Sequence, residues 1–420
     1  MKILTISNAA WDDCNSVGNT QSNWFSGWDD LELYSMYTRQ RPPNNMCCSH
    51  YYSVTIKDIL KHLFCWKAIG EEFEISSESQ LESSNIESRA VSGIKGWKKN
   101  VLQFLIEIIY SSQIWLNRKM KVYLQGVDPD IVFCFAIAEP FRYNVLKYIK
   151  AHSGAKIVMW IADDVYGQAQ NKGEVMRRIY LRRYHRLFSM ADKLYGVSEM
   201  LCNEYSQIFN RSIIPLYKGC EFSPCREVLN TPLQMVYAGN LLYGRDSTLA
   251  KIAEQLKILN QTASKIQLFI YSTTAVPKDT LVKLNIKGSS QLCGAKPYKE
   301  ILEIMNKADI ALHVESFDEN QIKKVRLSFS TKIIDCMQSG AVMMVIGPRD
   351  IASVEYPRSI PGVIVIDELE NISHELQKIV EEPSIVLSKA IQLRRYALEN
   401  HAKKSVQTLL QEDFYLLINK

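Results

Sequence analysis

The sequence lacks any long uninterrupted apolar run. None of its 420 residues lie in a segment that approaches the about 18 consecutive apolar residues of a membrane-spanning helix. The first residues, MKILTISNAAWDD, turn acidic after a short apolar run and have no small-residue cleavage site, so they do not resemble a signal peptide. We therefore expect a cytoplasmic protein whose residues 2–7 form a buried first strand.

The ten cysteines contain no CxxC pair, and several lie in apolar runs such as IVFCFAI. This pattern predicts buried, reduced thiols rather than a zinc site or a disulfide framework. The seven histidines are scattered, and the one DPD triplet, 128–130, precedes a strand instead of following one. We expect no metal and no cofactor.

The sequence also has little excess of one sign of charge over the other. Lys and Arg number 50 against 45 acidic residues, which gives a net charge of +5. That excess is too small to indicate a nucleic-acid binder, but it suits an anionic ligand or a contact with a membrane surface. No GxxxxGK[ST] motif is present and no GxGxxG follows a strand, which argues against a P-loop kinase and a dinucleotide dehydrogenase.

What the sequence does contain is a repeated alternation of short β-branched runs and longer helical patterns, typical of parallel sheets covered by helices. The expected strands are 2–7, 130–136, 156–163, 193–198, 233–240, 266–272, 309–315, 341–347 and 362–367.

A linker interrupts this alternation near residues 212–232, where proline recurs and no helical period is visible. We predict an N-terminal Rossmann-like acceptor domain over 1–213 and a second Rossmann-like donor domain over 214–392. Residues 393–420 are predicted to form a C-terminal helix that returns to the first domain.

A cluster of basic and hydroxyl side chains precedes one helical pattern in RLSFSTKIIDCMQSGAV. Arg326, Ser328, Ser330, Thr331 and Lys332 lie just before this apolar helix. Hydroxyls, cations and the free N–H groups of a helix start favour an anion such as phosphate. One turn later, Asp335 can accept hydrogen bonds from ribose hydroxyls.

Other polar residues follow the strands of the second half, and the carboxyl ends of parallel strands share one edge of a sheet. We therefore expect them to line one cleft with the cluster above. The set predicted to bind the donor is Gly18, Gly239, Asn240, Arg245, Ser272, Gly294, Glu315, Arg326, Ser328, Ser330, Thr331, Lys332 and Asp335.

Three stretches resemble the donor domain of GT-B glycosyltransferases, close to the large retaining nucleotide-sugar group of glycosyltransferase family 4: YAGNLLYGRDSTL, LCGAKPYKEILEIMNKADIALHVESFD and SFSTKIIDCMQSGAVMMVIG. The resemblance implies two Rossmann-like domains facing each other across a cleft, with C-terminal helices crossing back. It also implies that Gly239 and Arg245 bind the diphosphate, that Asp335 binds the ribose, and that the base contacts the loop around Gly294.

The chain departs from that family's pattern at two positions. Leu327 stands where the family has the earlier of two glutamates, and Asn240 stands where a basic residue often follows the glycine. The SFSTK signature resembles enzymes of bacterial polysaccharide assembly, such as capsule and O-antigen synthesis. The resemblance implies a metal-independent hexosyltransferase that retains the anomeric configuration and uses a UDP- or GDP-sugar.

In the first half, Gly18 lies before a helix, where it either brings backbone close to the donor or makes a plain turn. Asp163 and Asp164 end a strand and, with Arg245 and Lys332, are the predicted catalytic residues. They could equally cap the next helix. The stretch 139–143, EPFRY, is a third candidate.

Three segments keep open interpretations. Residues 71–90, rich in Ser and Glu, are expected to be a mobile loop. Residues 97–120 read either as a core helix or as a membrane-interface helix. The basic helix 176–190 reads either as a solvated face or as a surface for anionic lipid or a lipid-linked phosphate.

We expect transfer of a sugar from a nucleotide-diphosphate donor to a glycan acceptor at the inner face of the plasma membrane. The acceptor is expected to be lipid-linked. A sugar-nucleotide epimerase of the same fold is the alternative enzyme, and a non-catalytic binding protein of this fold is the alternative outside enzymes.

Overall fold

The structure of the chain is a computed structural model that describes residues 1–38, 42–56, 58–59, 69–75, 104 and 107–420. It divides into two compact units. Unit 1 comprises residues Met1–Val197, Cys202–Leu216 and Gln407–Lys420, and unit 2 comprises Ser198–Leu201 and Tyr217–Val406.

Unit 1 is built on an eight-stranded sheet with the order β4-β3-β2-β1-β5-β6-β7-β8. All neighbours are parallel except β3 and β4. The strands are β1 Lys2–Ile6, β2 Glu32–Tyr37, β3 His50–Ser53, β4 Glu71–Glu74, β5 Ile131–Phe135, β6 Lys156–Ile161, β7 Lys193–Gly196 and β8 Ile214–Pro215.

Helices follow β1, β5, β6 and β7 of unit 1, so that strand and helix alternate there as the sequence predicts. They are α1 Ser16–Phe25, α4 Arg118–Val127, α5 Pro140–His152, α6 Val165–Gln170, α7 Glu174–Met190, α8 Glu199–Phe209 and α17 Lys403–Ile418. Aromatic rings fill much of the core: Trp24 packs edge-on against Trp160 with ring centroids 5.0 Å apart, and Phe25 against Phe133 at 5.2 Å. Edge-to-face pairs of this kind add to the burial of apolar area.

Unit 2 is built on a fully parallel six-stranded sheet with the order β11-β10-β9-β12-β13-β14. Its strands are β9 Leu233–Ala238, β10 Ile266–Tyr271, β11 Ser290–Gly294, β12 Ile310–Val314, β13 Val342–Ile346 and β14 Ile364–Ile366. Numbered along the chain, this is the doubly wound order 3-2-1-4-5-6, which changes direction between β9 and β12.

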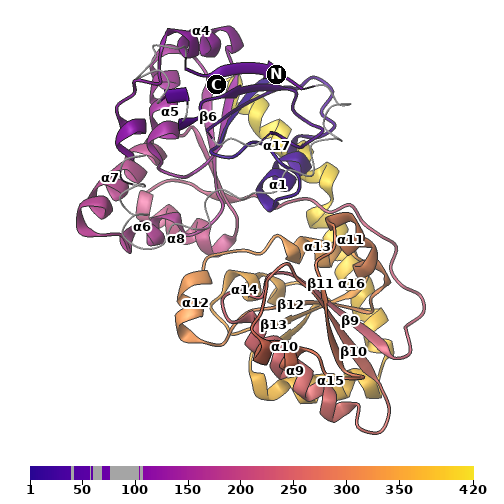
Figure 1. Ribbon diagram of the computed structural model, residues 1–420. Coiled ribbons are helices and arrows are strands. Elements are labelled where there is room, and N and C mark those ends of the chain that lie inside the picture. Colours follow the sequence, from indigo (N-terminus) through magenta and orange to yellow (C-terminus); the bar gives the residue numbers. More distant parts are fainter. Residues whose placement is uncertain (39–41, 57, 60–68, 76–103, 105–106) are drawn as a thin grey trace. The chain divides into compact units, whose positions relative to one another are not determined.

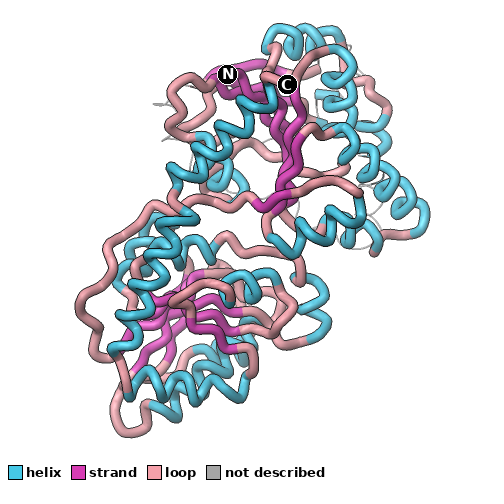
Figure 2. The backbone as a smooth tube through the Cα atoms, turned by 180° about the vertical axis from the view of Figure 1, so that it is seen from behind, coloured by secondary structure: helices cyan, strands magenta, loops and turns pink. Residues whose placement is uncertain are grey.

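Helices cover both faces of the unit 2 sheet, and Figures 1 and 2 show the strands enclosed between them. The helical elements are α9 Arg245–Leu259, α10 Lys278–Leu284, α11 Tyr298–Lys307, α12 Glu319–Val325, α13 Lys332–Gln338, α14 Ala352–Arg358, the 3-10 helix η1 Leu369–Asn371, α15 Ile372–Glu381 and α16 Ser384–His401. Met235, Leu268 and Ile310 from the strands pack with Leu249 and Leu376 from the helices in one buried cluster. Strands buried on both faces explain why their sequences are continuously apolar.

Two expectations about irregular segments are wrong where the structure describes them. Residues Glu71–Glu74 form β4 instead of a loop, because Phe73 stacks on Tyr51 with ring centroids 5.5 Å apart. The remainder of 71–90 lies mostly outside the described residues.

The stretch 97–120 is not one helix. Gln113 has a φ of 59°, which no helical residue adopts, and Asn117 caps the new helix α4 by accepting the N–H of Met120. Residues 97–103 and 105–106 lie outside the described part of the chain. Over the residues that are described, no helix is both long and apolar enough to cross a bilayer.

Candidate functional site

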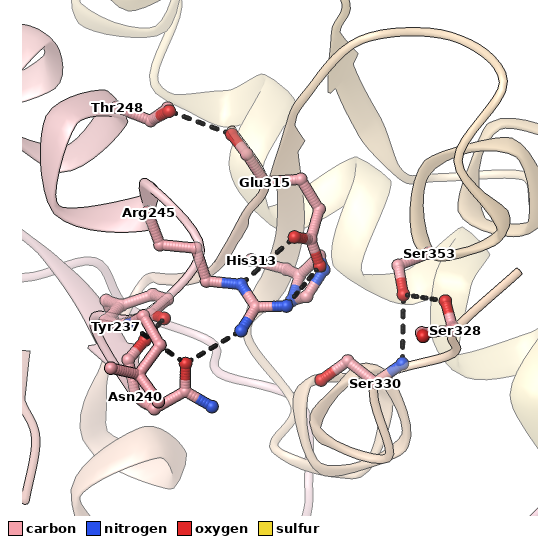
Figure 3. A network of polar contacts seen from close by, with 10 residues as sticks. Tyr237, Asn240, Arg245, Thr248, His313, Glu315, Ser328, Ser330 and Ser353 are labelled. Atoms are coloured by element: carbon pink, nitrogen blue, oxygen red, sulfur yellow. Dashed lines mark hydrogen bonds and ion pairs between the residues drawn. The ribbon is translucent and has the colours of Figure 1, made fainter. Parts of the chain in front are cut away.

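The carboxyl ends of β9 and β12 place an arginine beside a buried glutamate. Arg245 Nε lies 3.0 Å from Glu315 Oε2 and its Nη2 lies 2.8 Å from Oε1, while Nη1 donates to Asn240 Oδ1 at 2.8 Å (Figure 3). Because β9 and β12 flank the switch point of the sheet, this is the edge where doubly wound sheets bind ligands.

The turn between β9 and α9 fixes where Arg245 begins its helix. Tyr237 donates its hydroxyl to the carbonyl of Asn240 at 2.6 Å. Gly244 has a φ of 76°, and a Cβ there would lie 2.5 Å from Ser316 Oγ. Only glycine fits this backbone without strain, so the turn delivers Arg245 at the first position of α9.

Buried partners hold Glu315 in place. Its side chain is 1% exposed, His313 Nε2 lies 3.2 Å from Oε1, and Thr248 donates its hydroxyl to the Glu315 carbonyl at 2.8 Å (Figure 3). Burial alone would raise the pKa of Glu315, but His313 and Arg245 outweigh it and lower this pKa. Burial lowers the pKa of His313, so the imidazole is neutral and the pair Arg245–Glu315 carries no net charge.

Lys332 differs from Arg245 in its contacts. It is the first residue of α13 and partly buried, yet no hydrogen bond or ion pair joins its ammonium group to any residue that the structure describes. Burial lowers its pKa, with Asp335 acting in the opposite direction and the charge of Arg245 adding to the decrease. The Lys332 ammonium and Arg245 therefore act on each other electrostatically at the same edge of the sheet.

The carboxylate of Asp335 has two protein donors that the sequence analysis missed. Lys218 Nζ lies 3.0 Å from Asp335 Oδ1, and the Tyr298 hydroxyl donates to the same oxygen at 2.8 Å. Lys218 also donates to the Tyr298 hydroxyl at 2.9 Å. Lys218 comes from the linker and Tyr298 from the start of α11, so no local motif could have indicated either residue.

The other residues of the SFSTK stretch shape a loop between α12 and α13. Ser353 accepts the N–H of Ser330 at 2.9 Å and donates its hydroxyl to the Ser328 carbonyl at 3.1 Å (Figure 3). The carbonyl of Arg326 accepts the N–H of Ala352 at 2.8 Å. Thr331 adopts the cap position of α13, but its side chain makes no capping hydrogen bond.

The remaining predicted residues of the second half lie at strand ends of the same sheet. Gly239 follows β9, and its N–H donates to the Tyr271 carbonyl at 3.0 Å. Ser272 follows β10, with its N–H 3.0 Å from the Gly294 carbonyl at the end of β11. Gly294 has a φ of 77°, a conformation that favours glycine. The parallel sheet thus brings these ends to one edge, as expected.

In unit 1 the predicted residues make local contacts. Gly18 donates its N–H to Asn15 Oδ1 at 2.9 Å, and a Cβ on it would lie 2.1 Å from the carbonyl oxygen of Asp12. A close backbone approach therefore requires this glycine.

The two aspartates after β6 also have protein partners. Asp164 caps α6 by accepting the N–H of Gly167 at 2.9 Å, and it accepts the Tyr205 hydroxyl at 2.9 Å. Asp163 accepts the N–H of Asp164 at 2.8 Å and the side-chain amide of Gln168 at 2.9 Å. Glu139, from the third candidate stretch, precedes α5 with Oε2 3.8 Å from Arg142 Nη1.

Among the residues that the structure describes, no group of three or more His, Cys, Asp or Glu side chains could hold a metal ion. The nine described cysteines are free thiols, and five of them are buried.

No family model matches the sequence, and no curated protein matches it either. Solved structures do match over the full chain. The crystal structure of TarM has 11% identity and a TM-score of 0.63, and it covers 100% of this chain and 99% of its own.

Two further solved structures are similar to this chain over nearly its whole length. Sucrose-phosphate synthase from Thermosynechococcus elongatus has 10% identity and a TM-score of 0.61, with 100% of this chain and 99% of that chain covered. HepE of Anabaena, solved in complex with UDP and glucose, has 10% identity and a TM-score of 0.60, with 99% of each chain covered. The fold is therefore the GT-B fold of glycosyltransferases, as the resemblance of the sequence implied.

Proposed function

We propose that this protein is a glycosyltransferase that moves a sugar from a nucleotide-diphosphate donor to a glycan acceptor. The observation that carries the proposal is Lys332, an unpaired and partly buried cation at the ligand-binding edge of a GT-B donor unit. A buried charge without a partner is costly, and such residues cluster at functional sites. A diphosphate would provide the missing counter-charge.

Arg245 would bind the diphosphate together with Lys332. A guanidinium has five N–H donors, and Glu315 and Asn240 occupy three of them. The remaining two can donate to phosphate oxygens while the glutamate keeps the side chain in one orientation. Because Glu315 neutralises Arg245, the net positive charge at this edge comes from Lys332.

The same two side chains would stabilise the leaving group. When the bond between the sugar and the diphosphate breaks, negative charge increases on the departing phosphate oxygen. Arg245, which Glu315 and Asn240 hold in position, can stabilise that charge without reorganising, and Lys332 adds net positive charge. Such preorganised stabilisation is the largest single contribution in many enzymes.

Asp335 would hold the ribose. Its Oδ1 accepts hydrogen bonds from Lys218 and Tyr298, so the carboxylate has a fixed orientation. Its Oδ2 accepts no hydrogen bond from a described residue, and it is the oxygen we assign to a ribose hydroxyl. Ser272, Gly294 and the SFSTK loop would complete the donor site through backbone and hydroxyl groups.

The resemblance of the sequence to GT-B glycosyltransferases supports more specific proposals about stereochemistry, donor and acceptor. We propose anomeric retention, a UDP- or GDP-sugar as the donor without metal or other cofactor, and a lipid-linked glycan acceptor bound by unit 1. The corresponding role is surface polysaccharide synthesis, such as that of capsule or O-antigen, at the cytoplasmic face of the plasma membrane. Asp163 and Asp164 are proposed to orient the acceptor hydroxyl or donor sugar.

A thermal-shift panel of UDP, GDP, CDP and ADP, each with and without a sugar, tests the donor assignment. A ligand at 100 times its dissociation constant adds about 2.7 kcal/mol of stability. We expect one nucleotide to stabilise the wild type and to lose that effect in Lys332→Met. The matched control is Lys323→Met, which removes an exposed lysine of α12.

If no nucleotide stabilises the folded wild type, the donor assignment is wrong. A separate activity assay tests the alternatives. Transfer of the sugar to an acceptor distinguishes a glycosyltransferase from an epimerase, and turnover of a nucleotide sugar distinguishes either enzyme from a binding protein.

A further inference from the structure

Unit 1 contains a cavity that the proposed donor site does not use. It has a volume of about 360 Å³ and lies between α5, α7 and the short helical stretch that precedes α4. The lining residues are Ser111, Pro140, Tyr143, Asn144, Arg178, Ile179, Arg182, Arg183 and Arg186. Four of them are arginines from α7, and none is acidic.

The four arginines divide into two kinds by their partners. Arg183 is structural: its guanidinium lies 2.7 Å from Glu107 and donates to the Ala138 carbonyl at 2.9 Å. Arg178 forms an ion pair with Glu174 at 2.7 Å. The guanidinium groups of Arg182 and Arg186 make no hydrogen bond or ion pair with any residue that the structure describes. Over the described residues, these two exposed cations of the cavity therefore have no protein counter-charge in contact.

The spacing of these arginines makes the absence of a counter-charge significant. Arg178, Arg182 and Arg186 lie four residues apart, so their side chains are neighbours on one face of α7. Like charges at this spacing destabilise a helix, and a bound anion would reverse the effect. The cavity is also bounded by α5, so an anion held there would meet groups from both helices.

The donors around the cavity specify what kind of anion fits. Guanidinium groups match phosphate oxygens in paired, charge-assisted hydrogen bonds. Ser111 and Tyr143 also line the cavity, and a hydroxyl is a neutral group that can donate to an anion. The volume lies within the range of small-molecule sites and exceeds what a single phosphate needs, so part of a larger molecule can enter with the phosphate.

Apolar side chains are exposed beside this charge. Ile179 lines the cavity and is 39% exposed, Val175 one turn earlier on α7 is 70% exposed, and Ile108, three residues before Ser111, is 49% exposed. A ligand with a phosphate and an apolar part would contact both kinds of surface.

The cavity also lies at the functional edge of its sheet. Pro140 is the first residue of α5, which follows β5, and Arg183 holds the carbonyl of Ala138 in the loop between them. The loops after the strands of a doubly wound sheet are where ligands bind.

We propose that this cavity binds a phosphate or diphosphate group carried by the acceptor, with Arg182 and Arg186 as its principal ligands. The inference rests on the proposed function in so far as it calls the phosphate-bearing molecule an acceptor. The phosphate itself could come from a soluble molecule or from a lipid, and the experiment below treats the two sources separately.

The experiment uses the full chain with Lys332→Met, so that a diphosphate no longer finds its counter-charge at the donor site. The test variant adds Arg182→Gln and Arg186→Gln, which keep helix propensity nearly unchanged. The control variant adds Lys172→Gln and Arg177→Gln instead, removing the same charge from the same region but outside the cavity lining.

In the first arm, calorimetry measures binding of inorganic pyrophosphate. In the second arm, co-sedimentation measures binding to phosphatidylcholine vesicles with and without phosphatidylglycerol. We expect the test variant to weaken binding about tenfold or more in at least one arm and the control to change it less than about twofold. Loss in the pyrophosphate arm indicates a soluble or exposed phosphate, and loss in the vesicle arm alone indicates a lipid headgroup.

Equal weakening by test and control variants would mean general charge attraction and overturn the proposal, as would no binding in either arm. Circular dichroism of both variants verifies that α7 still forms. The donor proposal is tested independently with nucleotides on the wild type. Failure there with pyrophosphate still bound by the cavity would remove the donor assignment and leave this site in place.

Discussion

Unit 2 contains two lysines near Asp335 that differ in their partners. Lys218 is 7% exposed and is fully engaged by Asp335 and Tyr298. Lys332 is partly buried and is bonded to no described residue. Over the described residues, the protein thus pairs one cation directly and leaves the other without a hydrogen bond or ion pair, a few residues before the same aspartate.

Under the proposed function, Lys218 is a positioning residue and Lys332 is a ligand-binding one. A buried ion pair costs desolvation and gives orientation, whereas an unpaired cation gives an affinity for anions at the expense of stability. Substitution of Lys218 should therefore affect stability more than donor binding, and substitution of Lys332 should affect donor binding more than stability.

The largest expected effect is that of Lys218→Met. Removing one partner of a buried pair leaves an uncompensated charge and costs about 3–5 kcal/mol. Urea denaturation should show that decrease in the free energy of unfolding. A loss below about 1 kcal/mol, the scale of an exposed pair, would mean that the comparison of the two lysines is wrong.

The second effect is on catalysis. Lys332→Met should lower kcat/KM by about 10²–10³, the scale found when a preorganised electrostatic group is removed. The free energy of unfolding should stay equal or increase, because the substitution removes an unpaired charge. Steady-state kinetics and urea denaturation on one preparation check both; a large loss of stability would contradict the assignment.

The third effect concerns the orientation of Arg245. Glu315→Gln keeps the shape of the side chain but removes the charge that Arg245 contacts through two N–H groups. The loss should be about 1.5–3 kcal/mol in stability, the value of hydrogen bonds to charged groups. Donor affinity should also decrease because the guanidinium is less fixed. Unchanged stability would show that the pair is not formed in solution.

A smaller effect on stability is expected for Asp164 of unit 1, whose contacts are those of a helix cap. Asp164→Ala removes the cap of α6 and should cost about 1 kcal/mol of unfolding free energy. Activity measured well below the melting temperature shows whether the carboxylate does more than this. A decrease in kcat of a hundredfold there would assign Asp164 a part in catalysis.

The smallest effect is a pH dependence. The pKa of Lys332 is lowered from 10.5, so its charge is lost at a lower pH than that of an exposed lysine. Nucleotide affinity should therefore decrease as pH rises through the lowered pKa. Stability without ligand should increase between that pKa and 10.5, where only the unfolded chain keeps the proton. Lys332→Met should abolish this alkaline component in calorimetric titrations, and its persistence would assign it elsewhere.

Much of the fold was predictable because buried parallel strands are continuously apolar. All nine predicted strands form, among them β5, which matches 130–136 to within a residue at each end. Five strands were not predicted: β2, β3, β4, β8 and β11. ELYSMY and HYYS mix polar and aromatic residues toward the edge of the unit 1 sheet, and SQLCG lies at the edge of unit 2. Edge positions impose a weaker hydrophobic pattern.

The candidate site was predictable only where its residues follow strands. Gly239, Arg245 and Glu315 could be grouped because the ends of parallel strands meet at one edge. Lys218 could not, since it lies 117 residues before Asp335 in a linker without any periodic pattern. The arginine cavity was visible only as a basic helical stretch, because Tyr143 and Ser111 join it through tertiary packing.

The last helix of the chain gives unit 1 an unusual order of assembly. Residues Gln407–Lys420 of α17 belong to unit 1, where buried Phe414 packs against Phe25 and Trp28 and Asp413 accepts the Tyr195 hydroxyl at 2.6 Å. A ribosome makes these residues only after the whole of unit 2. The half of the protein that is synthesised first is therefore completed last, and until then its aromatic core stays open to chaperones or to aggregation.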